Sequence, residues 1–167
     1  MRFTVTADTD IGILKTINQD SVLIKHSIIN NDEILLAVIC DGMGGLPKGE
    51  LASAAVVRAF SQWFESELPY EIDHADMQVI GGKWALMLRE LNGRILEYSK
   101  VNMIEGMGTT FSGILFLKDQ YIIGHVGDSR IYQIGALMTQ MTTDQTFVAR
   151  EVSRGTECRK MSSPFLL

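Results

Sequence analysis

The chain has 167 residues, a length typical of one domain, and 46% of them are hydrophobic, which is enough to build a substantial core. The formal net charge of −5 argues against a general nucleic-acid binder, because such a protein needs a basic surface to neutralise phosphates. The N-terminal residues lack the apolar centre of a signal peptide, and no apolar run is long enough to span a bilayer. We therefore expect a cytoplasmic protein that binds neither nucleic acid nor membrane.

The first third of the chain predicts three strands. Residues 2–7 alternate between apolar and polar side chains, and residues 21–29 do so less regularly. Residues 33–40 contain an unbroken apolar run, which is typical of a strand buried on both faces. The polar segment 9–19 is expected to be a loop, and the residues around Asn31 predict a turn between the second and third strands.

Two helices are expected in the middle of the chain. In each of them the apolar residues recur at spacings of three and four, the pattern of an amphipathic helix. The two sets are Ala52, Ala55, Val56, Ala59, Phe60 and Trp63, and then Ile80, Trp84, Met87, Leu88, Leu91 and Ile95. Pro69 is expected to end the first helical segment, and the pair Gly81–Gly82 to delay or kink the start of the second.

Strand patterns return in the last part of the chain, over residues 109–117, 121–126 and 131–134, and a further helix is expected to begin within 142–151. Short polar connections between neighbouring strands favour antiparallel pairing. Strands, then two helices, then more strands predict an α+β layered domain rather than an alternating βαβ fold. Cys40, inside the third strand pattern, is expected to be a buried free thiol, since it has no C-x-x-C partner.

Asp41 is the sharpest candidate for a functional residue. It follows a buried strand directly, and Gly42, Gly44 and Gly45 come close behind it. Glycines let the backbone turn tightly and bring carbonyl oxygens near a ligand. Carboxylate and carbonyl oxygens together suit a hard cation such as Mg²⁺ or Mn²⁺. Taken alone, however, an Asp–Gly pair also reads as an ordinary turn with a solvated carboxylate.

Two other acidic residues occupy similar positions. Asp128 follows the apolar strand pattern that ends at Val126, and Asp20 precedes the strand pattern 21–29. Each is consistent with a polar turn when read by itself. The glycines after Asp41 do not form a phosphate-binding loop, because no Gly-Lys-Ser/Thr follows them. His125 lies within a strand pattern and is expected to be structural.

The ordered set of motifs is more informative than any one of them. It comprises Asn18-Gln19-Asp20, Asp41-Gly42-Met43-Gly44-Gly45 with Gly49-Glu50 and Ala52-Ser53, Gly108-Thr109-Thr110, Val126-Gly127-Asp128-Ser129-Arg130 with Tyr132, Leu137 through Thr142, and Thr143-Asp144-Gln145. In order and spacing this set resembles the bacterial branch of the PPM-type, or type 2C, metal-dependent Ser/Thr protein phosphatases. The resemblance covers residues 1–154 as the N-terminal portion of such a domain, and residues 155–167 form a divergent tail.

The resemblance implies a fold and a two-metal centre. The implied fold is a four-layer α/β/β/α sandwich of two antiparallel sheets flanked by helices, incomplete at the C-terminus. Asp41 would bridge two Mg²⁺ or Mn²⁺ ions, the Gly42 carbonyl would complete part of one shell, and Asp20 would assist the second ion. Asp128 would contact metal-bound water and support a weaker third ion. A metal-activated water would then attack phosphorus, so no protein nucleophile is needed.

Two departures from the family pattern affect the expected activity. The family usually has an Arg that binds phosphate five residues before the Asp matching Asp20, and here that residue is Lys15, which keeps the charge but lacks the planar fork. Family members also continue with further strands and two more metal-binding aspartates, the first in a Ser-Asp-Gly motif, whereas no Asp follows Asp144 here.

Two functions therefore stay open at the level of sequence. The first is hydrolysis of phosphoserine and phosphothreonine on proteins, with phosphorylated proteins and a cognate Ser/Thr kinase system as partners. The second is a catalytically impaired, phosphatase-like module that binds phosphoproteins or other partners. Retention of Asp20, Asp41 and Asp128 favours the first, and the absent C-terminal ligands favour the second.

Overall fold

A computed structural model describes residues 2–29, 31–43, 48–72 and 76–145 of the chain. Its main sheet is antiparallel, with the strand order β1-β2-β3-β4. These strands are β1 (Ser21–Ile29), β2 (Asp32–Cys40), β3 (Phe111–Leu117) and β4 (Gln120–Val126). A second, two-stranded antiparallel sheet pairs β5 (Tyr132–Ile134) with β6 (Met138–Gln140). The expectation of two antiparallel sheets in an α+β fold is thus confirmed.

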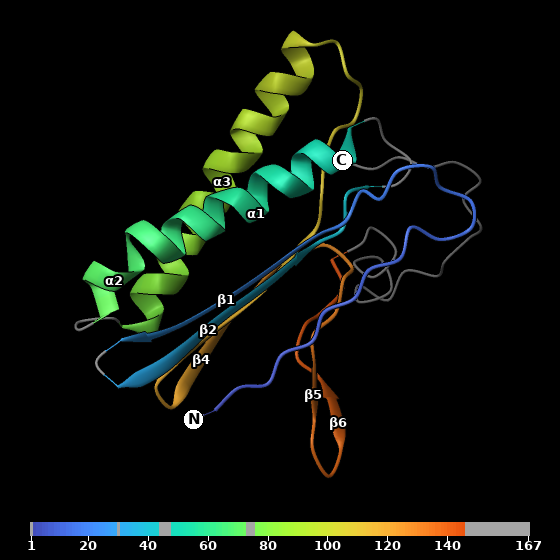
Figure 1. The fold of residues 1–167 in the computed structure, drawn as a ribbon. Coiled ribbons are helices and arrows are strands. Elements are labelled where there is room, and N and C mark those ends of the chain that lie inside the picture. The colour runs from blue at the N-terminus through green and yellow to red at the C-terminus, as the bar shows by residue number, and fades with distance from the viewer. Residues whose placement is uncertain (1, 30, 44–47, 73–75, 146–167) are drawn as a thin grey trace, which may run out of the picture.

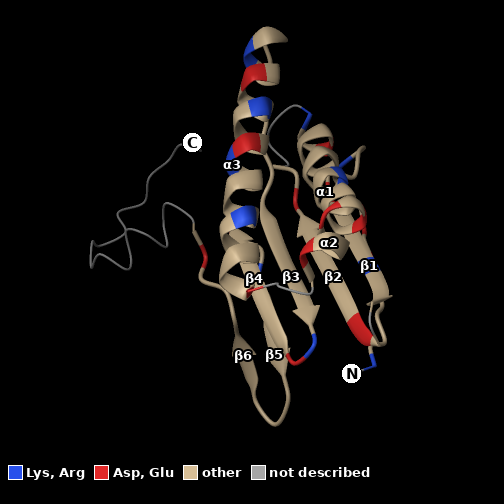
Figure 2. Cartoon of the chain, turned by 90° about the vertical axis from the view of Figure 1, so that its left-hand side faces the viewer, with Lys and Arg blue, Asp and Glu red and all other residues tan. Residues whose placement is uncertain are grey.

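The helices lie on one side of the four-stranded sheet, and the N-terminal segment and the β5–β6 hairpin lie on the other (Figure 1). They are α1 (Gly49–Ser66), α2 (Leu68–Glu71) and α3 (Met77–Val101). Figure 2 shows acidic and basic residues following one another along α3, whereas β3 carries none. This contrast is expected, because a strand buried between layers cannot solvate charge while one side of a covering helix can. Within the described residues, no helix is long and apolar enough to cross a membrane.

The two expected helices form, but their ends differ from the sequence prediction. Pro69 does not simply end α1: it lies in the first turn of the short helix α2, where its missing N–H has no helical partner to lose. The expected late start of α3 is wrong. The Asp76 side chain accepts a hydrogen bond from the Gln78 N–H (2.7 Å) and caps α3 at its N-terminus, so the glycines at 81 and 82 lie inside the helix.

The core fills the space between the helices and the inner face of the sheet. An aromatic cluster joins the layers: the ring of Phe60 from α1 lies 4.6 Å from that of Phe111 on β3 and 5.2 Å from that of Trp84 on α3. The rings of Trp63 and Trp84 meet edge to face at 5.8 Å. All of these side chains are buried. Because each ring removes about 150–250 Å² from water, this cluster fixes how α1 and α3 sit on the sheet.

The sequence prediction for the N-terminal segment is wrong. Residues 2–7 form no strand, and residues 2–20 contain neither helix nor strand. Phe3 instead packs on the outer face of the sheet, with its ring 5.3 Å from that of Phe116. The alternating pattern is therefore explained by side-chain packing without backbone pairing. Residues 142–145 are not helical, and the rest of the helix expected within 142–151 lies outside the described residues.

Candidate metal centre

Asp41 stands at the end of the central strand β2, and the start of β3 fixes its backbone. The Asp41 N–H donates to Thr110 Oγ1 (3.0 Å), and the Asp41 carbonyl accepts from the Thr110 N–H (2.9 Å) and from Thr109 Oγ1 (3.0 Å). These three bonds account for both polar groups of the Asp41 peptide. The carboxylate is thus carried by a rigid backbone, as a ligand for a metal ion requires.

The segment that carries Asp20 runs directly against this corner. The Gly42 N–H donates to the Gln19 carbonyl (3.1 Å), and the Asp20 N–H donates to Asn18 Oδ1 (3.0 Å), which holds a tight polar turn before β1. β1 and β2 are antiparallel neighbours, with Ser21 opposite Cys40. The next residue outward on each strand, Asp20 and Asp41, therefore lies at the same end of the sheet. The two aspartates are thus brought together by strand register.

The pKa of Asp41 reflects this arrangement. Burial raises it, and the negative charge of Asp20 and a hydrogen bond with that side chain raise it further. The positive charge of Lys15 lowers the pKa of Asp41, and the charge of Asp128 raises it. All three of the other charged side chains expected at the site therefore act on Asp41. A pair of carboxylates that repel each other in this way is stabilised when a cation binds between them.

Asp128 reaches the site from the end of β4 through a turn that requires glycine. Gly127 has φ +114°, and a Cβ atom there would meet Thr110 Cγ2 at 2.7 Å, so only glycine fits. The Gly127 carbonyl accepts from the Gln145 N–H (2.7 Å) and faces His125 Nε2 at 3.1 Å. The expectation that His125 is structural is consistent with these contacts, because its ring holds the turn that presents Asp128.

Thr110 connects the Asp41 corner to the turn that carries Asp128. Its hydroxyl accepts the Asp41 N–H and lies 2.9 Å from Ser129 Oγ, next to Asp128. Thr110 belongs to the Gly108-Thr109-Thr110 motif, but the sequence alone predicts no role for it. The only signal available was the Gly-Thr-Thr spacing, which does not reveal a contact with residues 69 and 19 positions away.

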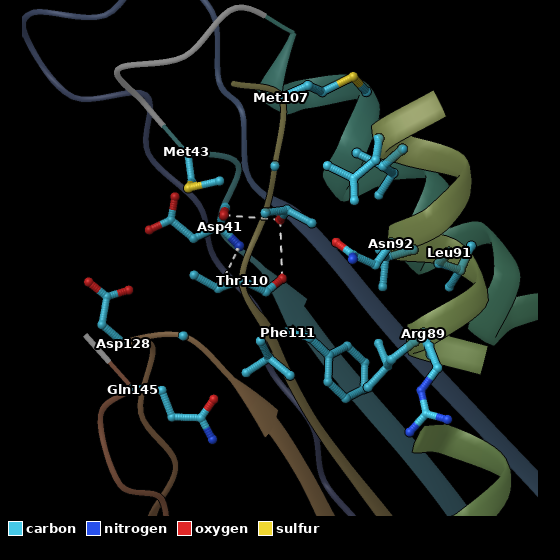
Figure 3. A pocket seen from close by; sticks show the side chains of 18 residues that line it. Asp41, Met43, Arg89, Leu91, Asn92, Met107, Thr110, Phe111, Asp128 and Gln145 are labelled. Atoms are coloured by element: carbon cyan, nitrogen blue, oxygen red, sulfur yellow. Dashed lines mark hydrogen bonds between the residues drawn. The ribbon is translucent and has the colours of Figure 1, made fainter. Parts of the chain in front are cut away.

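A pocket of about 690 Å³ opens beside these residues, between α3 and the ends of β2, β3 and β4. Asp41 and Asp128 lie along one side of it, and the apolar residues Leu91 and Phe111 and the cation Arg89 lie toward the other (Figure 3). The acidic side chains are therefore accessible, whereas Cys40 is buried, and burial raises the pKa of its thiol to about 12. The expectation of a buried free thiol is confirmed, and Cys40 is not a nucleophile at neutral pH.

The donor set fits a hard divalent cation in part. Asp20 and Asp41 supply carboxylate oxygens, the ligand type that such a cation prefers. Among the residues that the structure describes, however, no three Asp, Glu, His or Cys side chains lie close enough together to hold a metal ion. Asp20 and Asp41 therefore form the close pair, and Asp128 acts on it from a greater distance.

Comparison with known proteins identifies the family of the chain. The family profile described as protein phosphatase 2C matches residues 14–156, most of the chain. The chain belongs to the protein phosphatase 2C family. The matched region contains Lys15, Asp20, Asp41 and Asp128, so every residue expected at the site lies within the part of the chain that carries the family signature.

The relatives are bacterial Ser/Thr protein phosphatases. The chain is 32% identical over 155 residues to the phosphatase PstP of Mycobacterium tuberculosis, covering 89% of this chain and 26% of the relative. It is 30% identical to the phosphatase stp of Listeria innocua, covering 84% of this chain and 54% of the relative. The crystal structure of Stp1 from Staphylococcus aureus superposes with a TM-score of 0.73 at 32% identity, over 90% of this chain and 57% of that one.

The structure of the PstP catalytic domain in complex with two manganese ions is also similar, with a TM-score of 0.68 at 32% identity over 87% of this chain and 57% of that one. The chain thus spans about half the length, or less, of the curated relatives described above.

Proposed function

We propose that this chain carries out metal-dependent hydrolysis of phosphoserine and phosphothreonine on proteins, with Asp20 and Asp41 as the close carboxylate pair of its metal centre. The observation that supports it is the contact between these two carboxylates at one end of the sheet, with Lys15 and Asp128 close enough to act on Asp41. A cytoplasmic location and a cognate Ser/Thr kinase as the source of the substrate belong to the same proposal.

Asp41, Asp20 and the Gly42 carbonyl would hold Mg²⁺ or Mn²⁺ ions, and Asp128 would support a further, more weakly bound ion. When bound, such ions supply the activation of a water and the neutralisation of charge on the phosphoryl oxygens. The residues of the chain bind and orient: Thr110 holds the Asp41 backbone, and Lys15 offers its ammonium to the substrate phosphate.

The experiment that tests this proposal is Mn²⁺-dependent release of phosphate from a phosphothreonine peptide. We expect turnover that requires Mn²⁺ and that falls by at least about a hundredfold in Asp41→Asn, because the substitution removes a charged ligand while keeping the shape of the side chain. Turnover that survives Asp41→Asn, or that persists in excess chelator, would contradict the proposed centre.

A second candidate is a module that binds phosphoproteins without hydrolysing them. It is favoured by one observation: the described residues do not gather three acidic side chains within reach of one ion. A site with fewer ligands loses the preorganisation on which catalysis depends. A folded chain that binds the phosphothreonine peptide in a calorimeter, but releases no phosphate with Mn²⁺, would establish this function instead.

A further inference from the structure

Ser53 is a fully buried polar residue that the proposed chemistry does not use. It lies on α1, on the face that packs against β1, and its exposed fraction is 0%. A buried hydroxyl of this kind is retained only where it has hydrogen-bond partners, so its contacts indicate what it holds in place.

The Ser53 hydroxyl has three neighbours. It donates to the Gln19 carbonyl at 2.6 Å, lies 3.3 Å from the Glu50 carbonyl, and lies 2.9 Å from Ser21 Oγ. Carbonyls only accept, and the hydroxyl has a single proton, which the shortest contact assigns to Gln19. Ser21 must then be the donor in the contact between the two hydroxyls.

The Gln19 carbonyl connects the segment that carries Asp20 to the segment that carries Asp41. It accepts the Ser53 hydroxyl and also the Gly42 N–H at 3.1 Å. The proposed ligand Asp20 follows Gln19 directly, and the proposed ligand Asp41 directly precedes Gly42. A single carbonyl oxygen, fixed from α1, therefore sets the position of one ligand segment relative to the other.

The backbone around this oxygen leaves no room for an alternative arrangement. A Cβ atom on Gly42 would lie 2.4 Å from the Gln19 carbonyl oxygen and 2.7 Å from the backbone of Gly49 in the first turn of α1. A Cβ atom on Gly49 would lie 3.0 Å from the Gly42 carbonyl carbon. The helix α1, the Gln19 segment and the Asp41–Gly42 corner are thus in direct contact. This contact fixes the position of the Gln19 carbonyl relative to the Ser53 hydroxyl.

We propose that Ser53 is a positioning residue of the metal centre: through the Gln19 carbonyl it holds Asp20 at the distance from Asp41 that a shared cation needs. This inference rests on the proposed function, since it assumes that Asp20 and Asp41 bind metal. Hydrogen bonds that orient ligands from outside the coordination shell typically contribute about 10- to 100-fold to metal affinity.

The test compares two substitutions of equal size, Ser53→Thr and Ser53→Val, which differ only in the hydroxyl. Mn²⁺ affinity is measured by isothermal titration calorimetry, and the melting temperature of the metal-free chain by circular dichroism. We expect Ser53→Thr to bind Mn²⁺ close to the unsubstituted chain and Ser53→Val to bind roughly 10-fold more weakly.

Ser99→Val is the matched control for loss of a buried hydroxyl. Ser99 is buried on α3 and also donates to a backbone carbonyl, that of Ile104, but it contacts neither ligand segment. We expect its loss to lower the melting temperature while leaving Mn²⁺ affinity unchanged, since destabilisation alone does not alter the separation of the carboxylates.

Equal Mn²⁺ affinity of Ser53→Thr and Ser53→Val would overturn the inference about Ser53 and leave the proposed function intact. A comparable loss of affinity in Ser99→Val would also overturn it, because the effect would then follow from stability. Failure of the unsubstituted chain to bind Mn²⁺ would overturn both proposals.

Discussion

Asp41 is held where its negative charge is unfavourable in the metal-free chain. Burial and the neighbouring Asp20 raise its pKa, and Lys15 only partly offsets this. A carboxylate with a raised pKa binds its proton more tightly in the folded chain than in the unfolded one, so its ionisation destabilises the folded state as the pH rises. Residues that bind ligands often carry such a cost in stability.

Asp41→Asn should therefore stabilise the metal-free chain at pH 7 while removing Mn²⁺ binding. The expected gain in melting temperature is roughly 1–3 °C, because the side chain is partly exposed and solvent screens the repulsion. The gain should shrink as the pH falls through the pKa of Asp41, since the native side chain is then protonated and neutral. Thermal melts in chelator at pH 7 and pH 4 measure both effects. A lower melting temperature at pH 7 would show that the Asp41 carboxylate is stabilising.

Lys15 is the proposed phosphate-binding residue, at a position where the family resemblance leads us to expect an Arg. It is exposed and its charge reaches Asp41, which places it near the site. An ammonium binds phosphate as a point charge, whereas a guanidinium forms two parallel hydrogen bonds. We expect Lys15→Arg to raise phosphothreonine-peptide affinity by roughly 3- to 10-fold and Lys15→Ala to lower it. Calorimetric titration of the three forms measures this, and equal affinity of the native chain and Lys15→Arg would show that the fork contributes nothing.

At the scale of the elements, helix α3 contains three glycines, and close packing explains only one of them. A Cβ atom at Gly82 or Gly93 would meet no atom within 4 Å, whereas one at Gly81 would lie 2.7 Å from Ile122 Cδ1 on β4. Gly81 thus lets the helix approach the strand, and Gly82 and Gly93 face open space. Glycine in a helix interior costs about 0.5–1 kcal/mol relative to alanine.

Gly82→Ala should accordingly raise the free energy of unfolding by about 0.5–1 kcal/mol, measured by urea denaturation. Gly81→Ala is the matched control: it gains the same helix propensity but must displace the end of the Ile122 side chain, so its net gain should be smaller. Equal stabilisation by both substitutions would mean that Ile122 moves aside freely and that helix and strand are not tightly packed there.

At the scale of the whole molecule, the two faces of the four-stranded sheet differ. The inner face carries the aromatic core, and the outer face keeps apolar side chains such as Ile28, Ile39 and Tyr121 about half exposed or more. The N-terminal segment lies on that outer side without strand pairing (Figure 1). Backbone amides are protected from exchange when they are hydrogen-bonded and buried, so the paired strands and the unpaired N-terminal segment should differ in protection.

Hydrogen exchange followed by mass spectrometry should find the central strands β2 and β3 most protected and residues 2–16 exchanging fastest among the described residues. The difference follows from the hydrogen bonds: β2 and β3 each pair with strands on both sides, whereas residues 2–16 lie in no sheet. Peptides from α3 serve as an internal reference for a helix packed on one face. Slow exchange over residues 2–7 would contradict this expectation and would indicate that they pair as the strand their alternating sequence predicts.

The sequence by itself determined the features that repeat locally. The apolar run that forms β2 and the three- and four-residue spacing of α1 and α3 specify their own secondary structure, since each residue contacts neighbours a few positions away. The resemblance to type 2C phosphatases groups Asp20, Asp41 and Asp128 as one proposed set, although each of them alone also fits a polar turn. Residues 2–7 carried the same kind of signal and were misread, because alternation does not reveal whether a partner strand exists.

Only the tertiary structure decided which groups touch. The contact of Asp20 with Asp41, the bonds from Thr110 to both halves of the site, and the bond from Ser53 to the Gln19 carbonyl join residues 19 to 69 positions apart. Such contacts depend on strand register and on the seating of α1 against the sheet, which no local pattern encodes. The sequence thus determined which side chains carry the proposed chemistry, and packing decided how firmly they are held.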